Sequence, residues 1–294
     1  MSAHTVRFKQ VDVFTAVPFK GNPLAVIFDA DDLDTAQMKA IARWTNLSET
    51  TFLVKATDPA ADYRVRIFTT EGELPFAGHP TLGTAHALLA SGYQPKVPGK
   101  LMQQCGAGLV ELKALDGGAW AFAAPRARVT PLPADLYPAL ADALRTDAVD
   151  FSAPPCGMDN GAPWLVVRVN SAAACLAIEP DAAALAHIVE AVGTHGLAVY
   201  GPHPADGPAT YEVRCLMVGG SLGIGEDPVT GSANAALAEL LSAQQRRPGL
   251  AYTARQGTVL GRAGSVSVEY DDAAGKTWIG GSSVTIVDGT FRLP

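Results

Sequence analysis

The chain has 294 residues, of which 48% are hydrophobic and 17% charged, and its formal net charge is −7. This length fits two domains of about 150 residues each, and this composition excludes a disordered chain. The negative charge, without any run of Lys or Arg, disfavours a nucleic-acid or anionic-membrane surface.

Secretion and membrane insertion are disfavoured as well. No stretch approaches the roughly 20 apolar residues that span a bilayer, and Met1 to Gln10 has no apolar core of a signal peptide. The four cysteines are too scattered for a zinc site or a disulfide framework. We therefore expect a cytoplasmic protein with buried, reduced thiols.

The first 60 residues predict an α/β pattern. Val6 to Phe14 and Pro23 to Phe28 have the character of strands. Asp34 to Gln37 resembles a capping box at the start of an amphipathic helix. A third strand, Phe52 to Val54, follows Glu49, which by itself is most simply a surface carboxylate.

The chain then repeats itself. Residues 63–89 align without a gap with residues 211–237, at an offset of 148 residues (211 − 63). The identical residues include types that rarely match by chance: Tyr63 with Tyr211, Arg66 with Arg214 and Pro80 with Pro228. Two copies predict a pseudo-symmetric pair of domains rather than a solenoid. We expect an N-terminal half at 1–130, which a final strand at 283–294 rejoins, and a C-terminal half at 131–282.

Each copy predicts a strand, a loop and a helix. Tyr63 to Phe68 and Tyr211 to Leu216 alternate in polarity, and Pro80 and Pro228 each occupy an expected first helical position. The helices, roughly 80–91 and 228–245, are apolar on most faces, which is typical of buried helices. Each half is therefore expected to wrap a sheet around a central helix. The Pro-rich segment 125–138 is the candidate linker.

The two helix starts are the candidate binding positions. A helix N-terminus offers free N–H groups and the positive end of a dipole, which suit a carboxylate, and the small residues Gly78, Gly231 and Ser232 allow close approach. His79 and Asp227 precede the two helices at the same repeat position and suit proton handling or substrate binding. The simpler alternatives are that the glycines only shape turns and that Asp227 is an ordinary N-cap.

Four sequence blocks together resemble the PhzF family of phenazine biosynthesis. They are Phe19–Pro23 (FKGNP), Asn46–Thr50 (NLSET), Pro75–Thr81 (PFAGHPT) and Glu226–Ser232 (EDPVTGS). The resemblance implies a diaminopimelate-epimerase-like fold of two half-barrels, a homodimer, and isomerisation of a small anionic substrate without a cofactor or metal. In the best-known member the substrate is trans-2,3-dihydro-3-hydroxyanthranilate.

The resemblance also assigns roles to residues. Glu49 is similar to the family's catalytic acid/base, and His79 and Asp227 are similar to the residues that hold the substrate. Further positions that are similar to site-lining residues are Ser48, Gly78, Gly231, Ser232 and Asn22. The implied mechanism needs one carboxylate that removes a proton from a carbon and returns it to another.

Two other functions stay open. Related epimerases and racemases on this fold use a pair of cysteines at the two helix starts, which this chain lacks there. A protein that kept the fold could also bind a small anion without catalysis. The motifs name neither the substrate nor the pathway.

Overall fold

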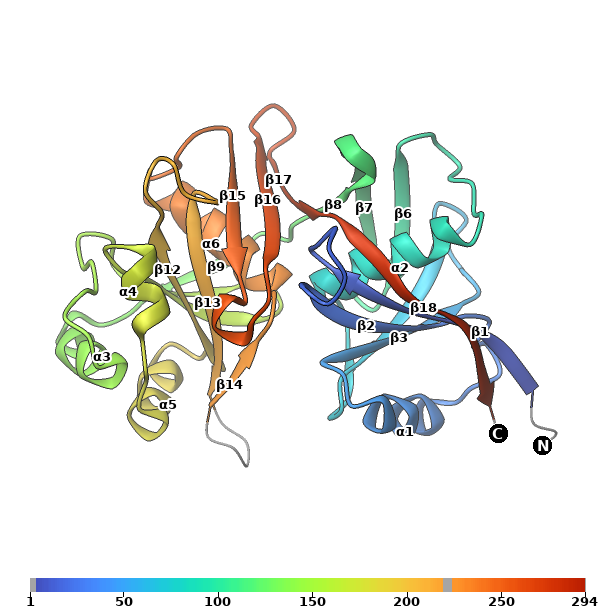
Figure 1. The fold of residues 1–294 in the computed structure, drawn as a ribbon, viewed down its shortest axis with the longest axis horizontal. Helices are drawn as coiled ribbons and strands as arrows, with labels where there is room; N and C mark the ends of the chain where they lie inside the picture. The colour runs from blue at the N-terminus through green and yellow to red at the C-terminus, as the bar shows by residue number, and fades with distance from the viewer. Residues whose placement is uncertain (1–3, 219–223, 294) are drawn as a thin grey trace. The chain divides into compact units, whose positions relative to one another are not determined.

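The structure is a computed structural model that describes residues 4–218 and 224–293. These residues form two compact units: the first ends at Ala123 and resumes at Gly280, and the second runs from Ala124 to Ile279 (Figure 1). The expected boundary at 130/131 lies within β9 (Arg128–Pro131), which pairs with β10 (Cys156–Asp159) of the second unit. Residues 219–223 of the second repeat lie outside the described residues.

The first unit is built on one mixed sheet. Across the sheet the strands are β18 (Ser283–Leu293), β1 (His4–Val13), β2 (Asn22–Ile27), β3 (Glu49–Val54), β4 (Tyr63–Phe68), β6 (Lys100–Cys105), β7 (Gly108–Ala114) and β8 (Trp120–Ala123). The pairs β2–β3 and β4–β6 are parallel, and the others are antiparallel. The short β5 (Glu73–Leu74) pairs with β4. The end of the chain thus returns to the first unit, where β18 lies beside β1 (Figure 1).

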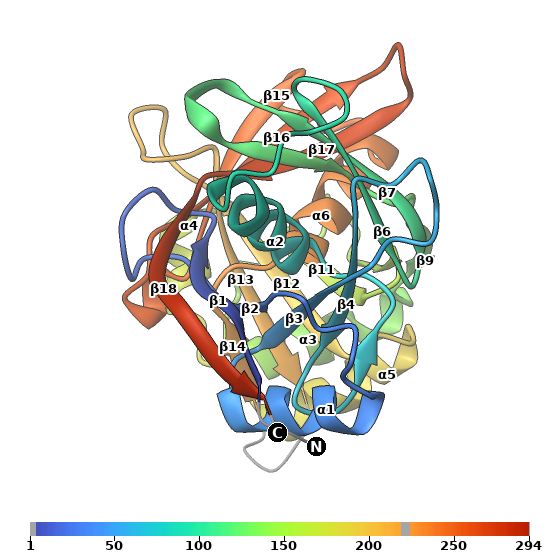
Figure 2. The same ribbon diagram turned by 90° about the vertical axis from the view of Figure 1, so that its right-hand side faces the viewer.

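Helix α2 (Gly78–Ala90) is the central element of the first unit. It packs against β1, β2, β3, β8 and β18, and most of its residues are buried (Figure 2). The helix comes close to the sheet at Gly83, where an added Cβ would lie 2.6 Å from Leu24 Cδ2 and 2.7 Å from Val13 Cγ2. Helix α1 (Thr35–Thr45) packs on β3 and β4, and it begins with the predicted capping box at Asp34.

The second unit repeats this plan. Its sheet order is β9, β10, β11 (Pro163–Arg168), β12 (Gly196–Pro202), β13 (Tyr211–Val218), β15 (Ala251–Gln256) and β16 (Gly264–Asp271), with β11–β12 and β13–β15 parallel. The buried central helix is α6 (Gly231–Ala243), and β14 (Ile224–Asp227) pairs with β13 as β5 does with β4. Additional helices are α3 (Tyr137–Leu144), α4 (Ala172–Ala177) and α5 (Ala182–Ala191), and β17 (Lys276–Gly281) leads the chain back to the first unit.

The helix register differs from the gapless sequence repeat. Helices α2 and α6 both have 13 residues, but they begin 153 residues apart (231 − 78), not 148. The reason is the hairpin before each helix: Phe68 pairs with Glu73, whereas Leu216 pairs with Glu226, so the second hairpin is five residues longer. The predicted helix starts at Pro80 and Pro228 are therefore wrong. Pro80 is the third residue of α2, and Pro228 precedes the N-cap Thr230 of α6.

Candidate active site

Glu49 lies at the start of β3 in the first unit. The chain reaches it from α1 through Asn46, which adopts a left-handed conformation with φ of 53° and ends the helix. The hydroxyls of Thr45 and Thr50 are 2.7 Å apart and tie the end of α1 to β3 on either side of this turn. Glu49 stands opposite Leu24 of β2, and its side chain is 16% exposed. A carboxylate is thus fixed at the edge of a buried region.

His79 is the second residue of α2, and its imidazole meets Glu49. The distance from His79 Nδ1 to Glu49 Oε2 is 3.4 Å, and only 4% of the His79 side chain is exposed. Burial lowers the pKa of His79 to about 3, against the opposing effect of a hydrogen bond to the backbone carbonyl of Pro23. The imidazole is therefore neutral at neutral pH, and its contact with Glu49 is not a pair of opposite charges.

The surroundings of His79 also decide which ring nitrogen carries its proton. The Pro23 carbonyl can only accept a hydrogen bond, and His79 Nε2 has no hydrogen-bond partner among the described residues. This pattern assigns the proton to Nδ1, which faces Pro23 and Glu49, and leaves Nε2 with a free lone pair. A buried lone pair of this kind can accept a hydrogen bond from a substrate.

The other predicted residues of the first unit are arranged around this pair. Ser48 is exposed and directly precedes Glu49, while Gly78 is the buried first residue of α2. Asn22 is fully buried at the start of β2. The loop before it is held by Asp12, whose carboxylate accepts a hydrogen bond of 3.1 Å from the Gly21 amide. The first unit thus brings together the N-terminal ends of β2, β3 and α2.

In the second unit Asp227 ends β14, just before α6. Its Oδ2 accepts a hydrogen bond of 2.6 Å from the Thr230 hydroxyl. Gly231 and Ser232 are the first two residues of α6, and Trp164 Nε1 donates a hydrogen bond of 3.0 Å to Ser232 Oγ. All three predicted residues of this unit therefore lie at the start of its central helix.

The predicted equivalence of His79 and Asp227 is wrong. His79 lies inside α2, and in the helix register of 153 residues its counterpart is Ser232 (79 + 153). Asp227 belongs to β14, in the hairpin that is longer in the second unit. The two residues share a repeat position only in the gapless alignment.

Sequence reasoning missed two polar residues at the start of α6. Thr230 is the N-cap position, and the fully buried Gln256 of β15 contacts it. Thr230 lies within the Glu226–Ser232 block, so the sequence offered a signal for it. Gln256 belongs to no motif and gave no such signal.

Comparison with known proteins identifies the chain. A family model described as phenazine biosynthesis-like protein (PhzC-PhzF) matches residues 11–289. The chain belongs to this PhzF family. A relative from Pseudomonas fluorescens, named trans-2,3-dihydro-3-hydroxyanthranilate isomerase, is 35% identical over 96% of this chain and 98% of its own length. A second relative, antisense-enhancing sequence 1 of Schizosaccharomyces pombe, is 37% identical over 98% of this chain and 99% of its own length.

The fold of the PhzF family is found in solved structures too. The crystal structure of a PhzF family protein of Bacillus anthracis matches with a TM-score of 0.83, at 22% identity, over 99% of both chains. Together with the named isomerases, this match confirms three predictions from the sequence: the PhzF family, the two-unit α/β fold around central helices, and the isomerase class.

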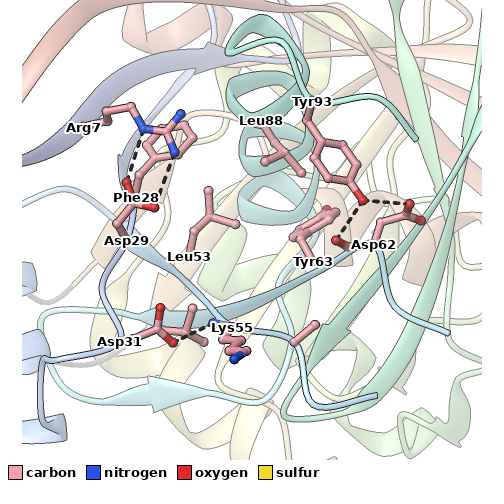
Figure 3. Close-up of a pocket in the computed structure, with 12 residues that line it drawn as sticks. Arg7, Phe28, Asp29, Asp31, Leu53, Lys55, Asp62, Tyr63, Leu88 and Tyr93 are labelled. Atoms are coloured by element: carbon pink, nitrogen blue, oxygen red, sulfur yellow. Dashed lines mark hydrogen bonds and ion pairs between the residues drawn. The ribbon is translucent and has the colours of Figure 1, made fainter. Parts of the chain in front are cut away.

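A hollow of about 270 Å³ lies elsewhere in the first unit of this PhzF protein, near the C-terminal end of α2 (Figure 3). Leu53 and Leu88 line it together with polar and charged groups, several of which bond to one another. Arg7 Nε donates to Asp29 at 3.2 Å, and the Tyr93 hydroxyl donates to Asp62 Oδ1 at 3.1 Å. The hollow contains none of the predicted site residues, and we assign it no ligand.

Within 4–218 and 224–293, no three His, Cys, Asp or Glu side chains are grouped so that they could hold a metal ion. None of the helices in these ranges combines the length and the hydrophobicity needed to cross a bilayer.

Proposed function

We propose that this chain is a cofactor-independent isomerase in which Glu49 moves a proton between two carbons of a small carboxylate substrate. The observation that carries this proposal is the Glu49 carboxylate beside the neutral, buried imidazole of His79 at the start of α2. Glu49 is the acid/base: as a carboxylate it removes a proton from one carbon, and as a carboxylic acid it returns the proton to another.

The low pKa of His79 gives the two residues different tasks. Because burial disfavours the imidazolium, His79 does not take the proton that Glu49 has removed. The removed proton therefore resides on Glu49, whose side chain is 16% exposed and can exchange it with solvent, until the substrate takes a proton back. His79 instead holds the substrate through the free lone pair of Nε2.

The proposal includes the second unit as a substrate-binding element. Gly231 and Ser232 place backbone N–H groups at the positive end of α6, which favours a carboxylate. Asp227 and Ser232 are expected to bind the same substrate molecule that Glu49 acts on. Ser48, Gly78 and Asn22 complete the expected site, and a homodimer, a cytoplasmic location and a role in phenazine assembly remain predictions.

The named substrate of the Pseudomonas fluorescens relative is the first compound to test. Wild-type protein and trans-2,3-dihydro-3-hydroxyanthranilate are mixed in D2O, and the product is examined by NMR and mass spectrometry. We expect an isomer with deuterium on carbon, formed without added metal or cofactor. Binding without any exchange of a carbon-bound hydrogen, for this compound and its close analogues, would indicate a non-catalytic anion-binding protein.

A two-thiol racemase is the less favoured alternative. All four cysteines are buried, and none occupies a helix start. Burial raises the pKa of the Cys215 thiol well above its ordinary value, so this cysteine is a poor source of thiolate. Product chirality separates the two reactions, because a racemase converts one enantiomer into a mixture.

A further inference from the structure

A buried glutamine connects the start of α6 to Asp227. Gln256 is fully buried at the end of β15. Its Oε1 accepts hydrogen bonds from the Thr230 amide and from Asn234 Nδ2, both at 3.0 Å. Its Nε2 donates to the Asp227 carbonyl at 3.1 Å and to Thr230 Oγ1 at 2.9 Å.

These partners permit only one orientation of the Gln256 amide. A backbone N–H can only donate and a backbone carbonyl can only accept, so Oε1 faces the Thr230 amide and Nε2 faces the Asp227 carbonyl. A flipped amide would turn Nε2 toward the Thr230 amide and Asn234 Nδ2, which are donors, and Oε1 toward the Asp227 carbonyl, which is an acceptor. Such mismatched contacts are strongly unfavourable in a buried position.

The orientation of Gln256 determines which group accepts the hydrogen bond from the Thr230 hydroxyl. Because Thr230 Oγ1 already accepts a hydrogen bond from Gln256, its single proton is available for Asp227 Oδ2, which lies 2.6 Å away. Asp227 Oδ2 is therefore a hydrogen-bond acceptor in a fixed position. The described residues of the first unit form no such relay: Ala77 occupies the N-cap position of α2, and Gln103 bonds to Tyr63 and Thr81 instead.

We infer that Gln256 and Thr230 are positioning residues of the isomerase, which hold the Asp227 carboxylate as an acceptor for a hydroxyl or amino group of the substrate. This inference rests on the proposed function, since it concerns how Asp227 meets the substrate. A carboxylate that is held in one orientation binds a donor group of the substrate without first having to be ordered.

The decisive variants are Thr230→Val, which removes the hydroxyl at nearly constant shape, and Thr230→Ser, which keeps it. With trans-2,3-dihydro-3-hydroxyanthranilate we expect Thr230→Val to lower kcat/KM roughly tenfold or more, and Thr230→Ser to stay close to wild type. Tyr270→Phe is the matched control, because Tyr270 also donates a buried hydrogen bond to α6, at Ala238. It should lower stability without lowering kcat/KM.

The pH profile separates positioning from a structural effect. A hydroxyl that donates to a carboxylate favours its ionised form, so its loss in Thr230→Val should move the acid limb of kcat/KM to higher pH. The neighbouring Glu226 and its partner Arg214 are unchanged in this variant. The Cys215 thiol loses its hydrogen bond to Thr230, which moves its already raised pKa still higher and so away from the acid limb. The inference would be overturned if the acid limb of Thr230→Val stayed at the wild-type pH, or if Thr230→Ser lost as much kcat/KM as Thr230→Val.

A second measurement does not depend on turnover. Thr230→Val, Asp227→Asn and the double variant are compared in thermal unfolding, and we expect the double variant to be less destabilised than the sum of the single variants. Strict additivity would overturn the inference even in an active enzyme. If the wild-type protein converts no substrate, the proposed function fails, and this cycle still decides whether Thr230 holds Asp227.

Discussion

The starts of α2 and α6 are built on the same scaffold but carry different chemistry. Both helices have 13 residues and are buried, and the mixed sheets of the two units have the same order of strands. At α2 the titratable groups are His79 and Glu49, which touch each other. At α6 the corresponding helix position is Ser232, and the carboxylate of Asp227 comes from the preceding hairpin and is bonded to Thr230. A duplicated architecture can therefore carry a Glu–His contact at one helix start and a hydrogen-bonded carboxylate before the other.

The hairpins before the two helices also differ, in how deeply each buries an ion pair. Each contains an Arg–Glu pair, Arg66 with Glu73 in the first unit and Arg214 with Glu226 in the second. The first pair is partly exposed, at 20% and 39% of the side chains, whereas the second is buried at 7% and 9%. Arg214 also donates to the carbonyl of Ile178, at 2.8 Å, near the end of α4. The longer hairpin that carries Asp227 is thus anchored more firmly.

The largest effect on stability is expected where this anchor is removed. Arg214→Ala leaves the buried carboxylate of Glu226 without its partner, which costs about 3–5 kcal/mol of unfolding free energy. Arg66→Ala, the matched change in the first unit, should cost about 1 kcal/mol or less because solvent screens its pair. Urea unfolding of both variants measures the difference. Equal losses would show that burial of the second pair has no energetic consequence.

A smaller effect is expected in the pH dependence of stability. The pKa of His79 is lowered to about 3 in the folded chain, whereas an unfolded histidine titrates near 6.5. Between these values the unfolded state binds one more proton, so this group makes stability fall as the pH falls from about 6.5 to about 3. Its contribution to the slope is at most about 1.4 kcal/mol per pH unit.

The variant His79→Gln should remove this contribution. Ser232→Ala, at the matched position of α6, removes no titratable group and should leave the slope as it is in the wild type. Unfolding free energies at several pH values between 4 and 7 make the comparison. An unchanged slope in His79→Gln would mean that His79 is protonated in the folded chain and is paired with Glu49 as a charge.

Local patterns in the sequence predicted much of the architecture. Alternating polarity located the strand Tyr63–Phe68 and, as Tyr211 to Leu216, most of the strand Tyr211–Val218. The capping box located the start of α1. These signals depend on near neighbours. The gapless repeat failed at the second hairpin, since a loop can change length without changing the strands beside it. An alignment without a gap could not detect the five extra residues.

The site was less predictable from the sequence than the fold. Glu49 and His79 are 30 residues apart, and they meet only because β2 aligns β3 with the start of α2. Nothing in the spacing of these residues indicates that contact, and Glu49 was singled out only by the family resemblance. Gln256 gave no signal because a buried polar residue in a strand is recognised by its partners, which the sequence does not reveal.

The central claim is that Glu49 carries the proton, and Glu49→Gln tests it most directly. The measurement is the rate at which this variant transfers hydrogen between carbons of a substrate that the wild-type protein converts. We predict a loss of at least about 10²–10⁴-fold, because the amide cannot accept and return a proton, with substrate binding and thermal unfolding close to those of the wild type. Transfer at a near wild-type rate in Glu49→Gln would contradict the proposed mechanism.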